Sequence, residues 1–162
     1  RLPRITYGFN VGATWRGFDV SVLFQGVGQT WQRYAGKGID EGVGSKSYTD
    51  MHLNRWTQER FEAGEKITFP RLANAADDFN HHPNSFFVMD RSYLRLKNVE
   101  IGYTLPENIS KKFGASGFRV YISGDNLYTW DKLKTKSVDP EQTSVLTYPM
   151  LRTFNFGVST NF

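Results

Sequence analysis

The segment "RTFNFGVSTNF" (152–162) alternates apolar and polar residues, with a single exception at Thr160. One parity carries Phe154, Phe156, Val158 and Phe162, and the other carries small or polar residues. This period of two predicts a β-strand with one apolar face. In a soluble sheet that face would pack on a protein core. In an outer-membrane barrel it would contact lipid, and the polar face would line a wet lumen.

The composition limits the classes of protein to which the chain can belong. The 162 residues include no cysteine, which excludes disulfides and thiolate metal sites. The net charge of +4 is dispersed, so we expect no nucleic-acid partner. No run approaches the roughly 20 apolar residues of a spanning helix, and the longest, "VSVLF" (20–24), is strand-sized. No signal peptide opens the chain, so we expect any membrane location to depend on strands and on an export signal outside this chain.

Four further segments alternate in a similar way, one of them with a change of parity, so we expect an all-β fold of five antiparallel strands. Their ranges are about 4–15, 18–31, 92–105, 117–130 and 149–162. Arg16-Gly17 between the first two predicts a tight hairpin. The segment 106–116 predicts a short turn that holds one helical turn.

The remaining connections, 32–91 and 131–148, are longer, so short and long connections alternate along the chain. Outer-membrane barrels show this order because their periplasmic turns are short and their extracellular loops are long. The strand 118–130 would rise roughly 33 Å at ~3.3 Å per residue and a tilt of about 40°, more than the apolar band of about 25 Å. Aromatic residues lie at the strand ends, where a membrane interface would favour them. The alternative is that these rings belong to an ordinary protein core.

The third expected strand breaks the alternation. Leu94 and Leu96 have the opposite parity to Val99 and to the apolar residues that follow it. Either a bulge near Lys97-Asn98 resets the face, or Arg95 and Lys97 point outward towards headgroups. The sequence alone does not separate these two arrangements.

Several long motifs resemble one family of membrane proteins. These are "SYLRLKNVEIGYTLP" (92–106), "RVYISGDNLYTW" (119–130), "DPE" (139–141) and the ending "YP…RTFNFGVSTNF" (148–162). They resemble the carboxyl-terminal strands of SusC/RagA-type TonB-dependent outer-membrane transporters. The segments "PRITYGFNVGATWRGFDVSVLFQGVG" (3–28), "RWTQERF" and "FPRL" (69–72) resemble the preceding hairpin and the loop between.

The resemblance implies a barrel of about 22 strands in the outer membrane of a Gram-negative cell, in contact with lipid and lipopolysaccharide. It also implies a SusD-type surface lipoprotein as partner, energy relayed through the TonB complex, and import of oligosaccharides or peptides. Five strands cannot close a barrel, and open edges are not tolerated in lipid. We therefore expect the plug domain, the TonB contact and the other strands to lie outside this chain, with 1–162 forming the carboxyl-terminal part of the barrel.

The terminal strand also resembles the signal that the barrel-assembly machinery recognises in its clients. An edge strand with free N–H and C=O groups can pair with another sheet. The side chains that would present the apolar face of this signal are Phe154, Phe156, Val158 and Phe162.

The loop 32–91 and its base contain the residues that we consider for substrate or partner contact: Trp31, Tyr34, Tyr48 and Trp56. Their rings could stack on sugars. The structural alternative is that a loop of this length needs its own small core or a contact surface for the lipoprotein. "DMHLNRW" (50–56) predicts a short helix capped by Thr49 or Asp50.

We expect neither a cofactor nor an enzymatic activity. The segment "DDFNHH" (77–82) gathers Asp77 and Asp78 beside two histidines, and calcium would be the metal that suits such an oxygen-rich loop. All histidines lie in one loop, so no Ser/His/Asp arrangement can be proposed. Glu100 and Asp125 could face the lumen, where carboxylates are usually solvated.

The sequence leaves alternatives to nutrient import. A TonB-dependent receptor for siderophores or cobalamin, and a barrel-anchored surface adhesin or glycan-binding protein, would share these strands. The substrate is not identified, because we expect the residues that select it to lie mostly in the plug, upstream loops and lipoprotein.

Overall fold

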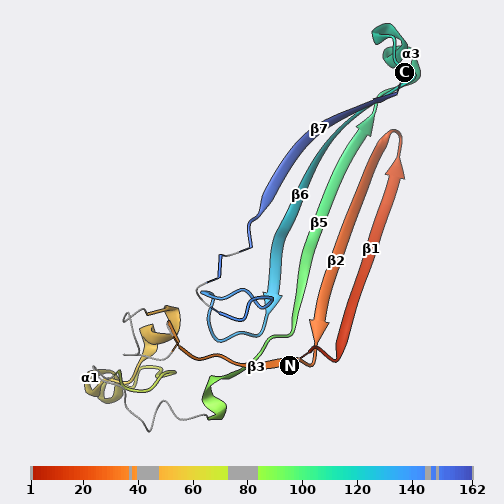
Figure 1. Cartoon of the computed structure of the whole chain (residues 1–162). Helices are drawn as coiled ribbons and strands as arrows, with labels where there is room; N and C mark the ends of the chain where they lie inside the picture. The colour runs from red at the N-terminus through yellow and green to blue at the C-terminus, as the bar shows by residue number, and fades with distance from the viewer. Residues whose placement is uncertain are drawn as a thin grey trace. The chain divides into compact units, whose positions relative to one another are not determined.

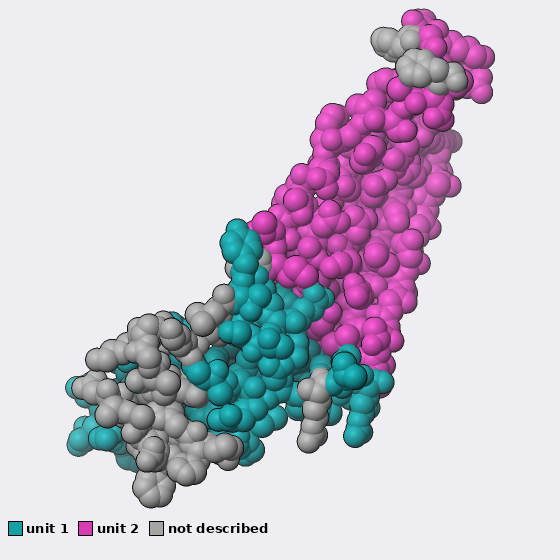
Figure 2. All heavy atoms as spheres, in the orientation of Figure 1, with its two compact units in different colours: residues 1–4, 29–92, 131–149 teal, residues 5–28, 93–130, 150–162 magenta. Residues whose placement is uncertain are grey.

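The computed structural model describes residues 2–36, 38–39, 48–72, 84–144, 147–148 and 150–161. The chain divides into two compact units (Figure 2). We call residues 5–28, 93–130 and 150–162 the sheet unit, and residues 1–4, 29–92 and 131–149 the loop unit.

The sheet unit contains one five-stranded sheet of order β1-β2-β5-β6-β7 (Figure 1). Its strands are β1 (Ile5–Trp15), β2 (Phe18–Gly28), β5 (Tyr93–Thr104), β6 (Gly117–Asp131) and β7 (Thr153–Asn161). Neighbouring strands run in opposite directions, as the arrows of Figure 1 show. The prediction of five antiparallel strands is therefore confirmed.

The predicted hairpin between β1 and β2 turns on two residues with positive φ. Arg16 has φ 47° and Gly17 has φ 88°, which is the combination that a two-residue type I′ turn requires. Thr104 donates its backbone N–H to the carbonyl oxygen of Gly17 at 2.8 Å. A Cβ at Gly17 would lie 2.9 Å from the carbonyl oxygen of Thr104, so both the turn and the neighbouring strand select glycine.

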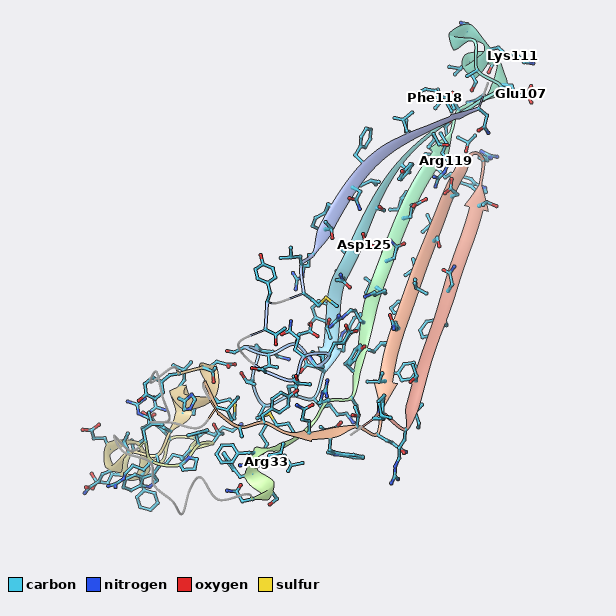
Figure 3. The ribbon with its side chains drawn as sticks, in the orientation of Figure 1. Arg33, Glu107, Lys111, Phe118, Arg119 and Asp125 are labelled. Carbon is cyan, nitrogen blue, oxygen red and sulfur yellow. The ribbon has the colours of Figure 1, made fainter. Side chains whose placement is uncertain are left out.

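Two short helices connect β5 and β6, where the sequence predicts one helical turn. They are α3 (Glu107–Ser110) and η3 (Lys111–Phe113), and η3 ends at Gly114, whose φ is 71°. Left-handed glycine is a common end to a helix. Glu107 and Lys111, labelled in Figure 3, lie one turn apart and form an exposed ion pair of 3.1 Å.

A bulge in β5 explains the break in its alternation. Leu23 of β2 pairs with Asn98, whereas the next residue, Phe24, pairs with Leu96, so Lys97 is the extra residue. One extra residue shifts the side-chain parity by one. Leu94 and Leu96 therefore share the apolar face of the sheet with Val99.

Two expected strand boundaries differ from the structure by more than one residue. The second strand, expected to reach Trp31, ends at Gly28, because Gln29 takes a left-handed φ of 54° that interrupts the extended chain. Trp31 instead begins β3 (Trp31–Arg33), which pairs with β4 (Val88–Asp90) in a separate two-stranded sheet. The last strand, expected from 149, begins at Thr153.

The loop unit adds short helices to that small sheet. They are η1 (Asp50–Asn54), α1 (Gln58–Glu62) and η2 (Ser85–Phe87). Thr49 is the N-cap of η1, which agrees with the predicted capped helix. Among the described residues, no helix is long and apolar enough to cross a membrane.

The hydrophobic core lies within the loop unit. Its buried members are Tyr34, Ile39, Met51, Phe69, Phe87, Met89, Leu133 and Val138. Leu133 and Val138 come from the connection 131–148 and the other members from 32–91, so the two connections fold together around one core. The structural alternative considered for the loop aromatics, a small core of their own, is thus present.

Candidate functional site

One face of the sheet presents apolar side chains that have no protein layer against them within the sheet unit that the structure describes. Cross-strand partners are apolar on both sides at Phe9 and Phe24, Val11 and Val22, Val20 and Ile101, Val120 and Val158, and Ile122 and Phe156. Phe154 and Phe156 are 71 % and 77 % exposed. Exposed apolar surface of this extent marks contact with lipid or another apolar surface.

Aromatic rings pair across the strands on the same face. The rings of Phe9 and Phe24 stack with centroids 4.8 Å apart, and those of Phe18 and Tyr103 lie 4.5 Å apart. Such pairs contribute about 0.2–1 kcal/mol each relative to alanine pairs. They stabilise the sheet without requiring a second layer behind it.

The opposite face carries a connected polar network. Arg119 on β6 donates from Nε to Oδ1 of Asp19 on β2 at 3.0 Å, and from Nη2 to Oε1 of Glu100 on β5 at 2.7 Å. The guanidinium group of Arg119 covers Gly102 on β5, and a Cβ at Gly102 would overlap it. The missing side chain lets one arginine of β6 reach across β5 to β2.

A second cluster of hydrogen-bonded polar side chains lies further along β6. It is centred on Asp125, which Figure 3 labels together with Arg119 of the first cluster. Asn98 donates to Asp125 at 2.8 Å, and Asn155 of β7 donates to the other oxygen of Asp125 at 3.3 Å. Glu100 and Asp125, considered above as lumen carboxylates, thus accept hydrogen bonds from side chains of neighbouring strands. This arrangement links strands β2, β5, β6 and β7 on their polar face.

The structure decides between the two arrangements left open for Arg95. Arg95 pairs with Gln25 on the polar face and is 1 % exposed. Its Nε donates to Oγ1 of Thr129 at 2.9 Å, and its guanidinium carbon lies 5.2 Å from the centre of the Tyr93 ring. The bulge is therefore correct, and an outward Arg95 is wrong. Sequence parity could not show this, because the pairing partner fixes the register.

The residues considered as an assembly signal lie on the edge strand. β7 is the last strand in the sheet order and pairs with β6 on one side. Phe154, Phe156 and Val158 all belong to its exposed apolar face. Phe162 lies outside the described residues.

The four loop residues considered for substrate or partner contact fall into two groups. Trp31, Tyr48 and Trp56 are 45 %, 50 % and 37 % exposed. Tyr34 is 2 % exposed and donates its hydroxyl to the carbonyl oxygen of Gln142 at 3.1 Å. Burial raises the pKa of the Tyr34 hydroxyl above its ordinary value. Tyr34 therefore stabilises the loop unit, and we omit it from the contact surface.

Sequence reasoning missed the role of Asp50, one of the residues that link the two connections through hydrogen bonds. Asp50 accepts from the backbone N–H of Lys136 at 2.8 Å, from the hydroxyl of Ser137 at 2.8 Å, and from the hydroxyl of Thr135. Burial alone would raise the pKa of the Asp50 carboxyl, but these hydrogen bonds outweigh it and hold the pKa below its ordinary value. The polar run "TKS" (135–137) is the only signal for this contact, and it does not identify its partner.

The loop unit also contains a pocket of about 450 Å³. It is lined by Met51, Asn54, Lys66, Thr68 and Lys134. No sequence motif marks it, because its residues come from both connections.

The metal candidates Asp77 and Asp78, with His81 and His82, lie outside the described residues. Within the described ranges, no group of three or more His, Asp or Glu side chains is placed to hold a metal ion. His52 is buried: its Nδ1 accepts from the Thr49 backbone N–H at 3.0 Å, and its Nε2 lies 3.2 Å from the carbonyl oxygen of Ile39. These contacts give His52 a structural role in the loop unit.

No protein-family model matches the chain. The chain does match two curated relatives from Formosa agariphila. TonB-dependent receptor P3 is 31 % identical over 176 residues, and TonB-dependent receptor P26 is 27 % identical over 177 residues. Each match covers 99 % of this chain but only 16 % and 17 % of the relative, so the chain spans about a sixth of their length.

Solved structures agree along the same length. The RagAB peptide transporter matches with a TM-score of 0.74, and the RagAB peptide importer in the 'open-open' state with a TM-score of 0.71. Both are 28 % identical, and each match covers 99 % of this chain and 17 % of the matched chain. By sequence and fold, the chain corresponds to a piece of a SusC/RagA-type TonB-dependent transporter. As in an outer-membrane SusC/RagA-type barrel, its strands carry one apolar and one polar face.

Proposed function

We propose that this chain is part of an outer-membrane transporter that imports oligosaccharides or peptides with energy relayed through TonB. The observation that carries the proposal is the sheet with one exposed apolar face and one hydrogen-bonded polar face, matched along its whole length to TonB-dependent receptors and to a peptide importer. A lipid-facing wall around a polar lumen needs these two faces.

The sheet is one part of the wall. β1 and β7 are the terminal strands of the described sheet, and unpaired strand edges are not tolerated in lipid. In the proposed transporter these edges pair with strands outside this chain, in a barrel of about 22 strands that surrounds a plug domain. The edge and apolar face of β7 would be recognised by the barrel-assembly machinery before closure.

The loop unit would be the extracellular part of this piece and would contact a SusD-type lipoprotein. Its described surface exposes large apolar side chains that its core does not use, including Leu53 and Phe61, which are 64 % and 67 % exposed. Trp31, Tyr48 and Trp56 are also accessible for a partner or substrate. Exposed rings of this kind are the residues that anchor protein interfaces.

Uptake in a strain that lacks the gene would test the proposal. Growth on a peptide mixture or on an oligosaccharide as sole nutrient should be lost, restored by the wild-type gene, and abolished by a protonophore. Retained growth on both nutrients, with loss of siderophore or cobalamin uptake, would select that receptor class instead. Loss of surface binding without loss of any uptake would select an adhesin.

Purification of the whole transporter in mild detergent would test the partner. We expect a surface lipoprotein to copurify and to be lost when Leu53 and Phe61 are both replaced by Ser. Replacing exposed Ile109, in the connection between β5 and β6, is the matched control. A monomer that binds no lipoprotein under conditions that preserve related assemblies would contradict this part of the proposal.

A further inference from the structure

The pocket in the loop unit combines two lysines with two polar side chains. Lys66 and Lys134 contribute the two charged side chains of its described lining, and Asn54, Thr68 and Met51 complete it. We propose that this pocket binds a carboxylate group of the imported molecule. The inference rests on the proposed function and extends it to the charge of the substrate.

Backbone hydrogen bonds fix the positions of Asn54 and Thr68. Thr68 donates its N–H to the carbonyl oxygen of Asn54 at 2.9 Å, and Phe69 donates to the same oxygen at 3.3 Å. Trp56, two positions after Asn54, donates its N–H to the carbonyl oxygen of Phe69 at 2.8 Å. The two segments are therefore held side by side, and Asn54 and Thr68 are placed together at the pocket.

The side chain of Asn54 is oriented by a further contact. Its Oδ1 accepts from Nη1 of Arg60 at 3.3 Å. Oδ1 faces Arg60, and Nδ2 carries the two N–H donors that Asn54 can offer to a ligand. Asn54 thus joins the pocket as a donor.

Lys134 is held by Phe86, a partly buried residue that packs against the core. Its Nζ donates to the carbonyl oxygen of Phe86 at 2.8 Å and lies 4.7 Å from the centre of the Phe86 ring. An ammonium group has three N–H donors, so one contact leaves capacity for a ligand. The position of the charge is therefore set before a ligand arrives, which lowers the ordering cost of binding.

Hydrogen-bond donors dominate the polar groups of this lining. Two ammonium groups, one amide N–H₂ and one hydroxyl can all donate, and the described lining contains no carboxylate. Such a set binds an anion. Peptides and oligosaccharides carry their negative charge mainly as carboxylates, in acidic side chains or in uronic acids, so a carboxylate is the group that the pocket would recognise.

Calorimetry with the whole purified transporter and two probe pairs would test the inference. One pair is an aspartate-containing peptide and the same peptide with asparagine. The other is an oligogalacturonate and its methyl ester. We expect the acidic member of one pair to bind more tightly than its neutral counterpart, and the pair that shows this preference identifies the source of the carboxylate.

Variants locate the preference. Lys66→Gln should weaken binding of the acidic probe about fivefold, and Lys66→Gln with Lys134→Gln should remove the preference. Lys66→Gln leaves the Lys134–Phe86 contact intact, so it keeps the test valid if the double variant folds poorly. Lys132→Gln removes the same charge outside the pocket and should bind like the wild type.

Equal binding of acidic and neutral probes to the wild type, or a preference that survives the lysine variants, would overturn the inference. The proposed function has a separate readout, because uptake is measured independently. Uptake of neutral substrates without an acidic preference would uphold the transporter and reject the carboxylate site. A lysine-dependent acidic preference without TonB-dependent uptake would do the opposite.

Discussion

Replacing Gly102 by Ala is expected to destabilise the sheet by displacing Arg119. The Arg119 guanidinium group lies directly over Gly102, and an added Cβ would overlap it. The flexible end of the arginine can move aside, but its hydrogen bonds to Asp19 and Glu100 would then be lost. The backbone of β5 need not change.

The magnitude follows from the exposure of the three charged groups. Their side chains are roughly one quarter to one third exposed, so water screens the attraction between them. A pair of this kind contributes about 0.2–1 kcal/mol. Two pairs that share one arginine are therefore expected to contribute about 1 kcal/mol to the free energy of unfolding.

Urea unfolding of the whole transporter in detergent would measure the loss, and a double-mutant cycle would assign it. Gly102→Ala should cost about 1 kcal/mol in the wild type and nearly nothing when Arg119 is already Gln. Gly28→Ala is the matched control, because a Cβ there would meet the Ile5 Cβ at an ordinary 3.7 Å. An equal cost of Gly102→Ala in both backgrounds would refute the reasoning.

Three further predictions test the faces of the sheet, the loop unit and the final strand. Phe156→Lys should reduce membrane insertion, since lysine on a lipid-facing strand costs up to ~2–4 kcal/mol, whereas Asn155→Lys on the polar face should insert normally; equal insertion of the two variants would contradict the assigned faces. Asp50→Asn should speed proteolysis of the loop unit by weakening hydrogen bonds worth about 1–2 kcal/mol. Because the pKa of Asp50 is lowered in the fold, its stabilisation is complete above the ordinary carboxyl pKa of about 4 and is lost as the pH falls through the folded pKa; the two proteins should therefore converge in acid, and Glu107→Gln, which removes an exposed carboxylate of the sheet unit, should leave proteolysis of the loop unit unchanged. Deleting Phe162 should slow assembly, measured as the rate at which the folded barrel appears, while molecules that fold transport normally; an unchanged rate would reject its role as a signal.

Local pattern was sufficient to locate the five strands of the larger sheet, but it predicted neither all of their ends nor the short strands β3 and β4. Alternation located all five, and Arg16-Gly17 fixed the first hairpin because few residue pairs adopt two positive φ angles. The family resemblance came from the same segments and is confirmed by the comparisons. Substrate selectivity and the SusD-type partner stay predictions.

Long-range contacts were the part that the sequence could not show. The sequence allowed two orientations for the Arg95 side chain, and only its pairing with Gln25 of β2 decides between them. A bulge changes side-chain parity without requiring a distinctive residue type, so it is not visible in the sequence. Tyr34 looked like its exposed neighbours, yet it packs in a core to which residues about one hundred positions later contribute. The hydrogen bonds of Asp50 and the lining of the lysine pocket also join residues from both connections, so no local sequence motif could predict them.

The shared core of the loop unit limits how the two connections can evolve or be engineered. Leu133 and Val138 from one connection fill space between side chains of the other, so neither connection can be shortened or exchanged without leaving a cavity in its neighbour. New specificities should therefore be inherited, or transplanted between barrels, as matched pairs of connections. A chimera that carries only one half would be expected to misfold at the surface while its wall stays intact.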